Sequence, residues 1–282
     1  SVELMIKSSP DVIQDLISYG VDFERNEDGS LAFTREGAHS QKRILYHEDI
    51  TGKEITRHLL EKVRQKKNVT LLENTPLVDL IVRGNVALGG VIKRNNQEEK
   101  VYAKKVVLAP GRDGSAWLTK VLSNQGLKLY NNQVDIGVRV ETSNIVMEEI
   151  NKNLYEGKFV YNTSVGTKVR TFCSNPSGHV VIENHSGTML ANGHAYHDPK
   201  LGSKNTNFAL LVSHTFSEPF NEPNEFAHEI SRLANKLSNG SVIVQRYGDI
   251  KRGRRTTYKR LKEGYTDPTL PEAVPGDLGL VL

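Results

Sequence analysis

The sequence lacks the features that would place it in several large classes of protein. Its single cysteine, Cys173, excludes an internal disulfide and a zinc site built from cysteine ligands. No apolar run approaches the roughly 20 residues that cross a membrane as a helix, and no signal-peptide pattern is present. A single cysteine also fits a reducing compartment. We therefore predict a cytoplasmic protein that does not span a membrane.

Charge of either sign is not in large excess. Lysine and arginine together number 37, and aspartate and glutamate number 33, which gives a net charge of +4. Nucleic-acid binders usually carry a stronger and more clustered basic excess, which argues against nucleic acid as a partner. The exception is the basic cluster "KRGRRTTYKRLKEG" at residues 251–264. We interpret it as a solvated surface or a contact to a cofactor pyrophosphate, with nucleic-acid binding as the weaker alternative.

Sequence motifs that identify common cofactor and catalytic sites are also absent. The chain has no G-x-G-x-x-G dinucleotide loop and no G-x-S-x-G nucleophile elbow, and its "GNVALGG" stretch lacks the lysine of a P-loop. His185, His194 and His197 precede Asp198, but their spacing matches no established zinc pattern, so we predict no metal. Cys173, in "RTFCSN", is expected to pack within a strand.

A strongly polar segment lies between two predicted helices. Residues 9–20 and 52–66 show the apolar stripe of amphipathic helices, with Pro10 in the first turn of the first helix and Gly20 as its stop. Residues 34–52 hold three basic residues, three acidic residues and two histidines. So many charges are costly to bury, and they follow no helical periodicity. The segment is therefore either a solvated loop with local ion pairs or part of a site.

Short strand-like runs separated by turn residues follow between residues 69 and 111. The last run is "KKVVLAPG", in which the three consecutive apolar residues 106–108 show no alternation with polar ones. This pattern is typical of a strand that is buried on both faces of a parallel sheet. We predict that the strand is central in such a sheet, with Gly111 at its carboxyl end facing a cleft, where open α/β sheets bind ligands.

A different pattern begins after a predicted helix at residues 114–129. Alternating strands dominate residues 135–244, interrupted by one helix at residues 224–240, which predicts a mainly antiparallel α+β domain. Arg139, in "DIGVRVET", and Arg170, in "KVRTFC", each alternate with apolar neighbours. We predict that the two arginines come from neighbouring strands and are candidate partners for an anion.

Two long stretches of the sequence resemble known flavoproteins. Residues 1–81, with "GVDFERNEDGSLAFTREGAHSQKRILYHEDITGKEITRHLLEKV", resemble the L-aspartate oxidase family of the succinate dehydrogenase/fumarate reductase flavoprotein superfamily. Residues 104–282, with "VVLAPGRDGSAWL", "NGHAY", "VQRYGDIKRGRRTT" and "PGDLGLVL", resemble FAD-dependent dehydrogenases of unassigned substrate. The chain is then either a divergent member or a composite of two genes that join between residues 81 and 104. In either case we expect an internal portion of a longer enzyme.

The resemblance implies a fold class of α/β plus α+β and a cofactor, FAD. Residues 1–126 are expected to form a partial, Rossmann-like FAD-binding domain that includes the polar active-site segment 34–52. Residues 127–265 would form a mainly antiparallel substrate or capping domain. Residues 266–282 would be a connector that returns to the FAD-binding domain.

The resemblance also implies roles for individual residues. As the catalytic group, Glu36 would contact the substrate, and Arg35 and His39 would shape the charge of its pocket. The residues expected to approach the cofactor are Thr51, Gly52, Val78, Gly111 and Arg112. Arg139 and Arg170 would then be substrate-binding candidates, because a buried carboxylate needs a basic partner.

We therefore expect an FAD-dependent dehydrogenase or oxidase that acts on a small carboxylate such as L-aspartate or succinate. The alternative is a non-catalytic module, derived from a flavoenzyme, that binds a ligand or a partner. FAD is expected to bind this chain only weakly, because flavoproteins of this kind hold the pyrophosphate at a glycine-rich loop that the sequence lacks. Each loss of about 1.4 kcal/mol lowers affinity tenfold.

Overall fold

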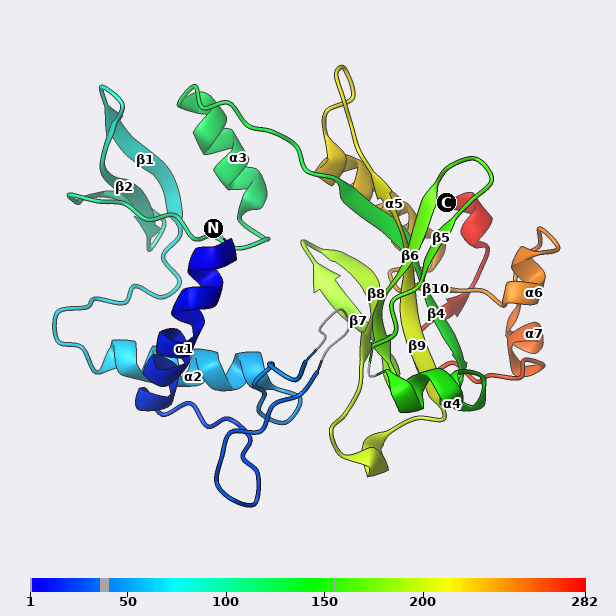
Figure 1. Ribbon diagram of the computed structural model, residues 1–282. Coiled ribbons are helices and arrows are strands. Elements are labelled where there is room, and N and C mark those ends of the chain that lie inside the picture. Colours follow the sequence, from blue (N-terminus) through cyan, green and yellow to red (C-terminus); the bar gives the residue numbers. More distant parts are fainter. Residues whose placement is uncertain (1, 36–40, 155) are drawn as a thin grey trace. The chain divides into compact units, whose positions relative to one another are not determined.

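The computed structural model describes residues 2–35, 41–154 and 156–282 (Figure 1). The chain divides into two compact units. Residues 60–130 form the smaller unit, and residues 1–59 together with 131–282 form the larger one. Helix α2 (Thr51–Arg64) begins in the larger unit and ends in the smaller one.

The smaller unit is built on a three-stranded antiparallel sheet and one helix. Its elements are β1 (Leu77–Arg83), β2 (Val86–Arg94), β3 (Gln97–Tyr102) and α3 (Ser115–Asn124), and the strand order is β1-β2-β3. Both tight turns contain two consecutive residues with positive φ, namely Gly84 with Asn85 and Asn95 with Asn96. Such turns match the twist of antiparallel strands. The strand-like runs predicted on both sides of Gly84 are therefore confirmed.

The prediction of a central parallel strand at residues 106–108 is wrong. These residues form no strand, and the side chain of Val107 is 88% exposed. A strand buried on both faces needs paired neighbours, whereas the described part of this unit offers only the antiparallel sheet, α3 and the end of α2. A cavity of about 380 Å³ does border the segment, although Gly111 is not in its lining, which consists of Leu77, Val107, Leu108, Ala109, Pro110, Gly114 and Trp117.

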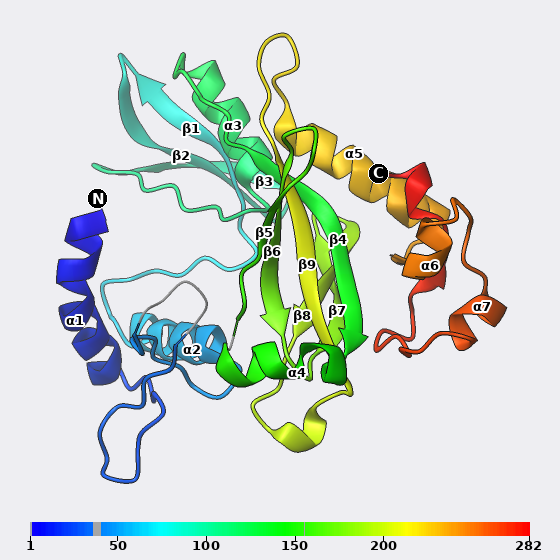
Figure 2. The ribbon, with the colours of Figure 1, turned by 45° about the vertical axis from the view of Figure 1, so that its right-hand side comes forward.

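The larger unit contains a four-stranded antiparallel sheet and a separate hairpin (Figure 2). The sheet has the order β4-β9-β6-β5, formed by β4 (Val134–Ser143), β9 (Asn205–His214), β6 (Lys168–Asn175) and β5 (Val160–Asn162). The hairpin β7 (His179–His185) and β8 (Thr188–His194) contacts this sheet. Among the described residues, the one parallel pair is β10 (Ile243–Val244) with β11 (Val274–Pro275).

The helices that lie wholly within the larger unit are short apart from α1 and α5. They are α1 (Val2–Ser18), α4 (Asn144–Asn153), α5 (Pro223–Leu237), α6 (Tyr247–Ile250) and α7 (Tyr258–Lys262), with the 3-10 turns η1 (Pro199–Leu201) and η2 (Leu278–Leu280). Helix α5 contacts both β4 and β8. Its Asn235 amide exchanges two hydrogen bonds with the backbone of Met189, at 2.8 and 2.9 Å. Helix α1 starts earlier than predicted, so Pro10 lies inside it and not in its first turn.

Polar side chains dominate the most deeply buried positions of the larger unit. The largest side chains that are less than 2% exposed are Asn207, Thr206, Thr256, Asp249, Pro275 and Ser238. Buried polar groups are stable only when they are hydrogen-bonded. The middle of this unit is therefore fixed by polar networks, and two of them include an arginine, Arg139 or Arg254.

The structure confirms the predicted mixture of α and β elements with mainly antiparallel sheets. The described residues up to 126 contain no parallel sheet, so the Rossmann-like arrangement stays a prediction. The domain boundaries at residues 126 and 265 also stay a prediction. They were inferred from the resemblance to flavoproteins, whereas the two units described above are defined by compactness. Every helix in the described ranges is too short or too polar to span a membrane.

Candidate functional site

Arg139 on β4 is the predicted site residue with the most unusual surroundings. Its Nη1 donates to the carbonyl oxygen of Cys173 at 3.0 Å and to Oδ1 of Asn207 at 2.8 Å. Its Nη2 donates to Oδ1 of Asn192 at 3.2 Å. These partners come from β6, β9 and β8, so one guanidinium ties four strands together. An arginine has five N–H donors, and only three are used here.

The positive charge of Arg139 has no negative partner among the residues that the structure describes. All three of its acceptors are neutral oxygens. Its Nε and the Nδ2 of Asn207 are both buried without any hydrogen-bond partner. Burying a charge and two unsatisfied donors is costly, and an acceptor with a negative charge would relieve both problems. The cluster can therefore bind an anion.

Local backbone features bring the strands close around Arg139. A bulge at residues 172–175 of β6 includes Cys173, whose φ is +50°. On β8, a Cβ atom at Gly193 would lie 2.2 Å from Oδ1 of Asn207 and 2.3 Å from Nη1 of Arg139. Real Cβ atoms do not come so near, so an alanine here would force the ends of these side chains to shift.

The polar segment 34–52 contacts the same hairpin. Nε2 of His194, at the end of β8, lies 3.2 Å from Oδ2 of Asp49. The rings of Tyr46 and His197 are 6.3 Å apart. His194 and Asn192 are two residues apart on one strand, so their side chains share a face of β8. The polar segment 34–52 therefore contacts β8, the strand whose Asn192 accepts a hydrogen bond from Arg139.

The predicted catalytic residues are only partly covered by the structure. Arg35 is half-buried and follows Thr34, which pairs with Ile44 in an isolated bridge. Glu36 and His39 lie outside the described residues. Their roles stay predictions.

The five predicted cofactor contacts are divided between the two units. Thr51 and Gly52 begin α2 in the larger unit, and the Thr51 hydroxyl accepts a hydrogen bond from the His47 amide at 3.0 Å. Val78, Gly111 and Arg112 belong to the smaller unit. The structure thus does not gather all five within one unit.

Both glycines of this group leave their backbone accessible. A Cβ at Gly52 or at Gly111 would meet no atom within 4 Å, and Gly111 has a φ of +68°. The carbonyl oxygen of Val78 is occupied by Nε1 of Trp117 at 3.0 Å, which joins β1 to α3. Open backbone at a glycine fits the close approach of a cofactor.

The prediction that Arg139 and Arg170 come from neighbouring strands is wrong, because β9 lies between β4 and β6. The two arginines nevertheless share a face of the sheet, since they pair with Ala209 and Leu211, two residues apart on β9. Arg170 differs from Arg139 in having a protein anion, Asp135, at 2.6 Å. Its charge is neutralised without a ligand.

Sequence reasoning missed the neutral partners of Arg139 and the partner of His194. Asparagine is disfavoured in strands, so the asparagines of "MLANGHAY" and "NTNFALLVS" were a usable signal for Asn192 and Asn207. Asp49 and His194 are 145 positions apart, and no local pattern links them. The described residues contain no group of three or more His, Cys, Asp or Glu side chains able to hold a metal ion.

Comparison with known proteins finds similarity for part of the chain. Residues 1–138 match the FAD binding domain family. An L-aspartate oxidase of Clostridium perfringens is 39% identical over 139 residues, which cover 49% of this chain and 31% of that protein. An L-aspartate oxidase of Clostridium acetobutylicum is 38% identical over 125 residues, covering 44% and 28% of the two chains.

A chloroplastic L-aspartate oxidase of Arabidopsis thaliana is 34% identical over 120 residues, covering 40% of this chain and 18% of that protein. The chain therefore spans less than a third of the length of these relatives. The alignment with the Clostridium perfringens protein covers 139 residues, more than the 81 residues over which we expected a resemblance to L-aspartate oxidases. The predicted relationship to FAD-dependent flavoproteins, and FAD as the cofactor of that family, are confirmed.

Proposed function

We propose that this chain, whose residues 1–138 match the FAD binding domain family, is part of an FAD-dependent oxidoreductase acting on a small carboxylate, such as L-aspartate or succinate. The names of the relatives, all L-aspartate oxidases, support this substrate class. The chemistry that FAD supplies when bound is acceptance of a hydride from a substrate carbon. The chain's own residues would bind and orient the carboxylate.

One observation carries the proposal of a carboxylate substrate: the Arg139 guanidinium is surrounded by neutral acceptors only, among the described residues. A substrate carboxylate would bring the missing negative charge. It would also bring acceptor oxygens for N–H donors that now have none, those of Arg139 and Asn207. Bonds between arginine and carboxylate are among the stronger hydrogen bonds in proteins.

We propose that Asp49 and His194 form a second polar side of the substrate site at Arg139. The Asp49 carboxylate orients the His194 ring, and a histidine held in this way can transfer a proton or bind an anion. We propose that the catalytic group predicted by resemblance, Arg35, Glu36 and His39, belongs to this side, with Glu36 in contact with the substrate.

The residues proposed to hold FAD are Thr51, Gly52, Val78, Gly111 and Arg112. The accessible backbone at Gly52 and Gly111 supports this assignment. Arg112 would contribute countercharge to the cofactor phosphates. The Rossmann-like sheet belongs to the proposal as well, since the described residues alone do not form it.

Calorimetric titration of the protein with succinate tests the substrate proposal. We expect Arg139→Gln to weaken succinate binding by about tenfold or more, because it removes the positive charge that would pair with the carboxylate. Arg170→Gln is the matched control, since Arg170 lies on the same sheet face but is paired with Asp135. Equal affinities for the wild type and Arg139→Gln, with Arg170→Gln the weaker binder, would refute the assignment.

The second candidate function is a non-catalytic module that binds a ligand or a partner. The absence of a parallel sheet among the described residues up to 126 favours it. The visible spectrum of the purified protein separates the two: flavin absorption bands indicate an assembled cofactor site, and a colourless protein favours the module. A titration with FAD complements it, and we expect a dissociation constant weaker than about 1 μM.

A further inference from the structure

Residues 246–262 form a second concentration of positive charge, which we call the basic loop cluster. The segment holds eight lysines and arginines and one carboxylate, Asp249, so its net charge is +7. The whole chain carries +4, which leaves a net charge of −3 for all other residues. The charge of this chain is therefore strongly asymmetric, and most of its basic excess lies in one segment.

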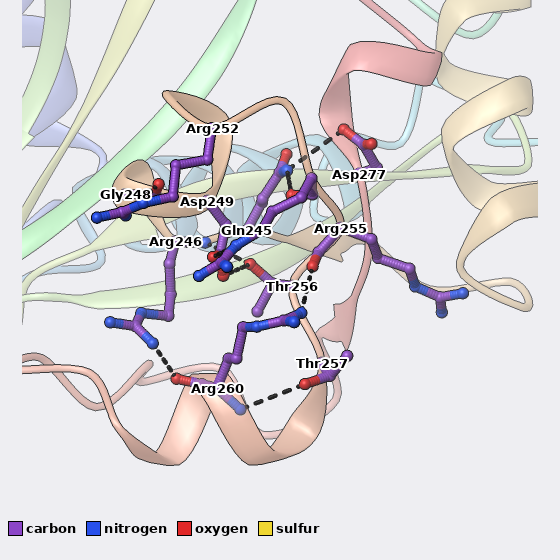
Figure 3. A network of polar contacts seen from close by, with 11 residues as sticks. Gln245, Arg246, Gly248, Asp249, Arg252, Arg255, Thr256, Thr257, Arg260 and Asp277 are labelled. Carbon is purple, nitrogen blue, oxygen red and sulfur yellow. Dashed lines mark hydrogen bonds and ion pairs between the residues drawn. The ribbon is translucent and has the colours of Figure 1, made fainter.

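The single carboxylate of the basic loop cluster is not exposed. Asp249 is only 1% exposed. It accepts hydrogen bonds from Nε of Arg254 at 2.6 Å and from the hydroxyl of Thr256 at 2.8 Å (Figure 3). Its negative charge is thus paired with Arg254 inside the fold, and the exposed charged side chains of residues 246–262 are all cations.

The other arginines of the cluster are held by backbone carbonyls and not by acids. Arg246 donates to the carbonyl of Arg260 at 2.6 Å, and Arg260 donates to that of Arg255 at 3.0 Å. Arg255 donates to the carbonyl of Pro275 at 3.2 Å, and Arg252 to that of Gly248 at 2.8 Å. These bonds fix the side chains without neutralising them, and each guanidinium keeps further N–H donors. The charges are therefore pre-positioned.

Exposed aromatic side chains accompany these charges. Tyr247 is 74% exposed and Tyr258 is 66% exposed, and Tyr265, three residues after the end of the cluster, is fully exposed. Arginine and tyrosine are the residue types that most often carry the binding energy of protein interfaces. Figure 3 shows the guanidinium groups of Arg246 and Arg255 pointing to different sides of the loop. This spread suits a broad contact patch better than a groove that follows a phosphate backbone.

We propose that the basic loop cluster is a docking surface for an acidic protein. Charge complementarity supports this occupant: residues 246–262 carry a net charge of +7 and expose no acid, so they attract an acidic partner and steer its approach. A second copy of this chain is a poor occupant, because its remaining surface is only weakly negative. The proposal does not depend on the chemistry assigned to the Arg139 site.

A direct test measures binding of a fluorescent glutamate-rich peptide to the full chain by anisotropy at low and high salt. The test variant combines Arg252→Gln, Lys259→Gln and Lys262→Gln, all exposed. The matched control combines Lys66→Gln, Lys67→Gln and Lys104→Gln, which removes the same charge from exposed positions elsewhere. We expect about tenfold weaker binding for the test variant, no change for the control, and loss of binding at high salt.

A single-stranded thymidine oligonucleotide of equal charge provides the competing arm. If it binds the wild type more tightly than the peptide does and the test variant abolishes this binding, the surface is a nucleic-acid site and the proposal is wrong. It is equally wrong if the peptide fails to bind or if both variants bind it alike. Circular dichroism spectra that match the wild type would show that the substitutions act on binding and not on folding.

Discussion

Arg254 and Arg139 both contact a deeply buried side chain of the larger unit, but with different electrostatic results. Arg254 binds Asp249, and Thr256 supplies a second donor to the same carboxylate. Arg139 binds Asn207 and two further neutral oxygens. In the first cluster, which we call the closed centre, the positive charge is paired with a carboxylate. In the second, which we call the open centre, the positive charge is unpaired among the described residues and two N–H donors have no hydrogen-bond partner.

The difference separates a structural role from a binding role. Burial raises the pKa of the Asp249 carboxyl, but hydrogen bonds from Arg254 and Thr256 and the charges of Arg254 and Arg260 outweigh this effect, so the pKa lies below its usual value. A centre in this state has nothing to gain from a ligand. The Arg139 centre would gain an acceptor and a countercharge, which is why we assign the carboxylate to it.

The largest loss of stability should follow from removing a hydrogen-bonding group of the closed centre. Thr256 is fully buried, and its hydroxyl donates to Asp249 and accepts from the Arg246 amide at 3.0 Å. Thr256→Val leaves both groups short of a partner, so we expect the free energy of unfolding in urea to fall by about 2–3 kcal/mol. The exposed Thr167→Val is the control, expected to change it by less than about 0.5 kcal/mol. Equal stabilities of the two variants would remove the distinction between the centres.

Adding a methyl group beside the open centre, at Gly193, should cause the next largest loss of stability. Gly193→Ala places a methyl group against Asn207 and Arg139, and overpacking of this kind costs about 2 kcal/mol of unfolding free energy. It should also weaken succinate binding. Gly52→Ala, at a position with open space in α2, should not destabilise the protein. A Gly193→Ala variant as stable as Gly52→Ala would show that β8 does not pack closely on Arg139.

Acid should weaken the closed centre selectively. Because the pKa of Asp249 is lowered, its stabilising contribution is complete above the usual carboxyl pKa of about 4 and is lost as the pH falls through the lower value in the folded state. Asp249→Asn lacks this ionisable group, so the urea midpoints of wild type and variant should converge as the pH decreases below the usual carboxyl pKa. Parallel pH profiles would contradict the proposed linkage.

The smallest effect on stability is expected from Arg139 itself. Removing an uncompensated charge relieves its desolvation cost, and glutamine can still donate to part of the neutral shell. Arg139→Gln should therefore change the free energy of unfolding by less than about 1 kcal/mol, although it weakens succinate binding. A loss as large as that of Thr256→Val would mean that Arg139 serves the fold and not a ligand.

Local patterns predicted the local structure well. The turn residues around Gly84 and the alternation in residues 135–244 gave strands that the structure confirms. The burial of residues 106–108 could not be predicted, because it depends on neighbouring strands and not on the run itself. The same limit applies to the Arg139 centre: its partners are 34, 53 and 68 positions away, and their convergence depends on sheet order and on a bulge.

The most direct test of the open centre is a crystal structure of the protein with succinate bound. Our account predicts that one carboxylate of succinate accepts hydrogen bonds from Nε of Arg139 and from Nδ2 of Asn207, the two atoms that now lack partners. A structure in which Arg139 keeps only its neutral contacts, while succinate is found elsewhere or not at all, would contradict it.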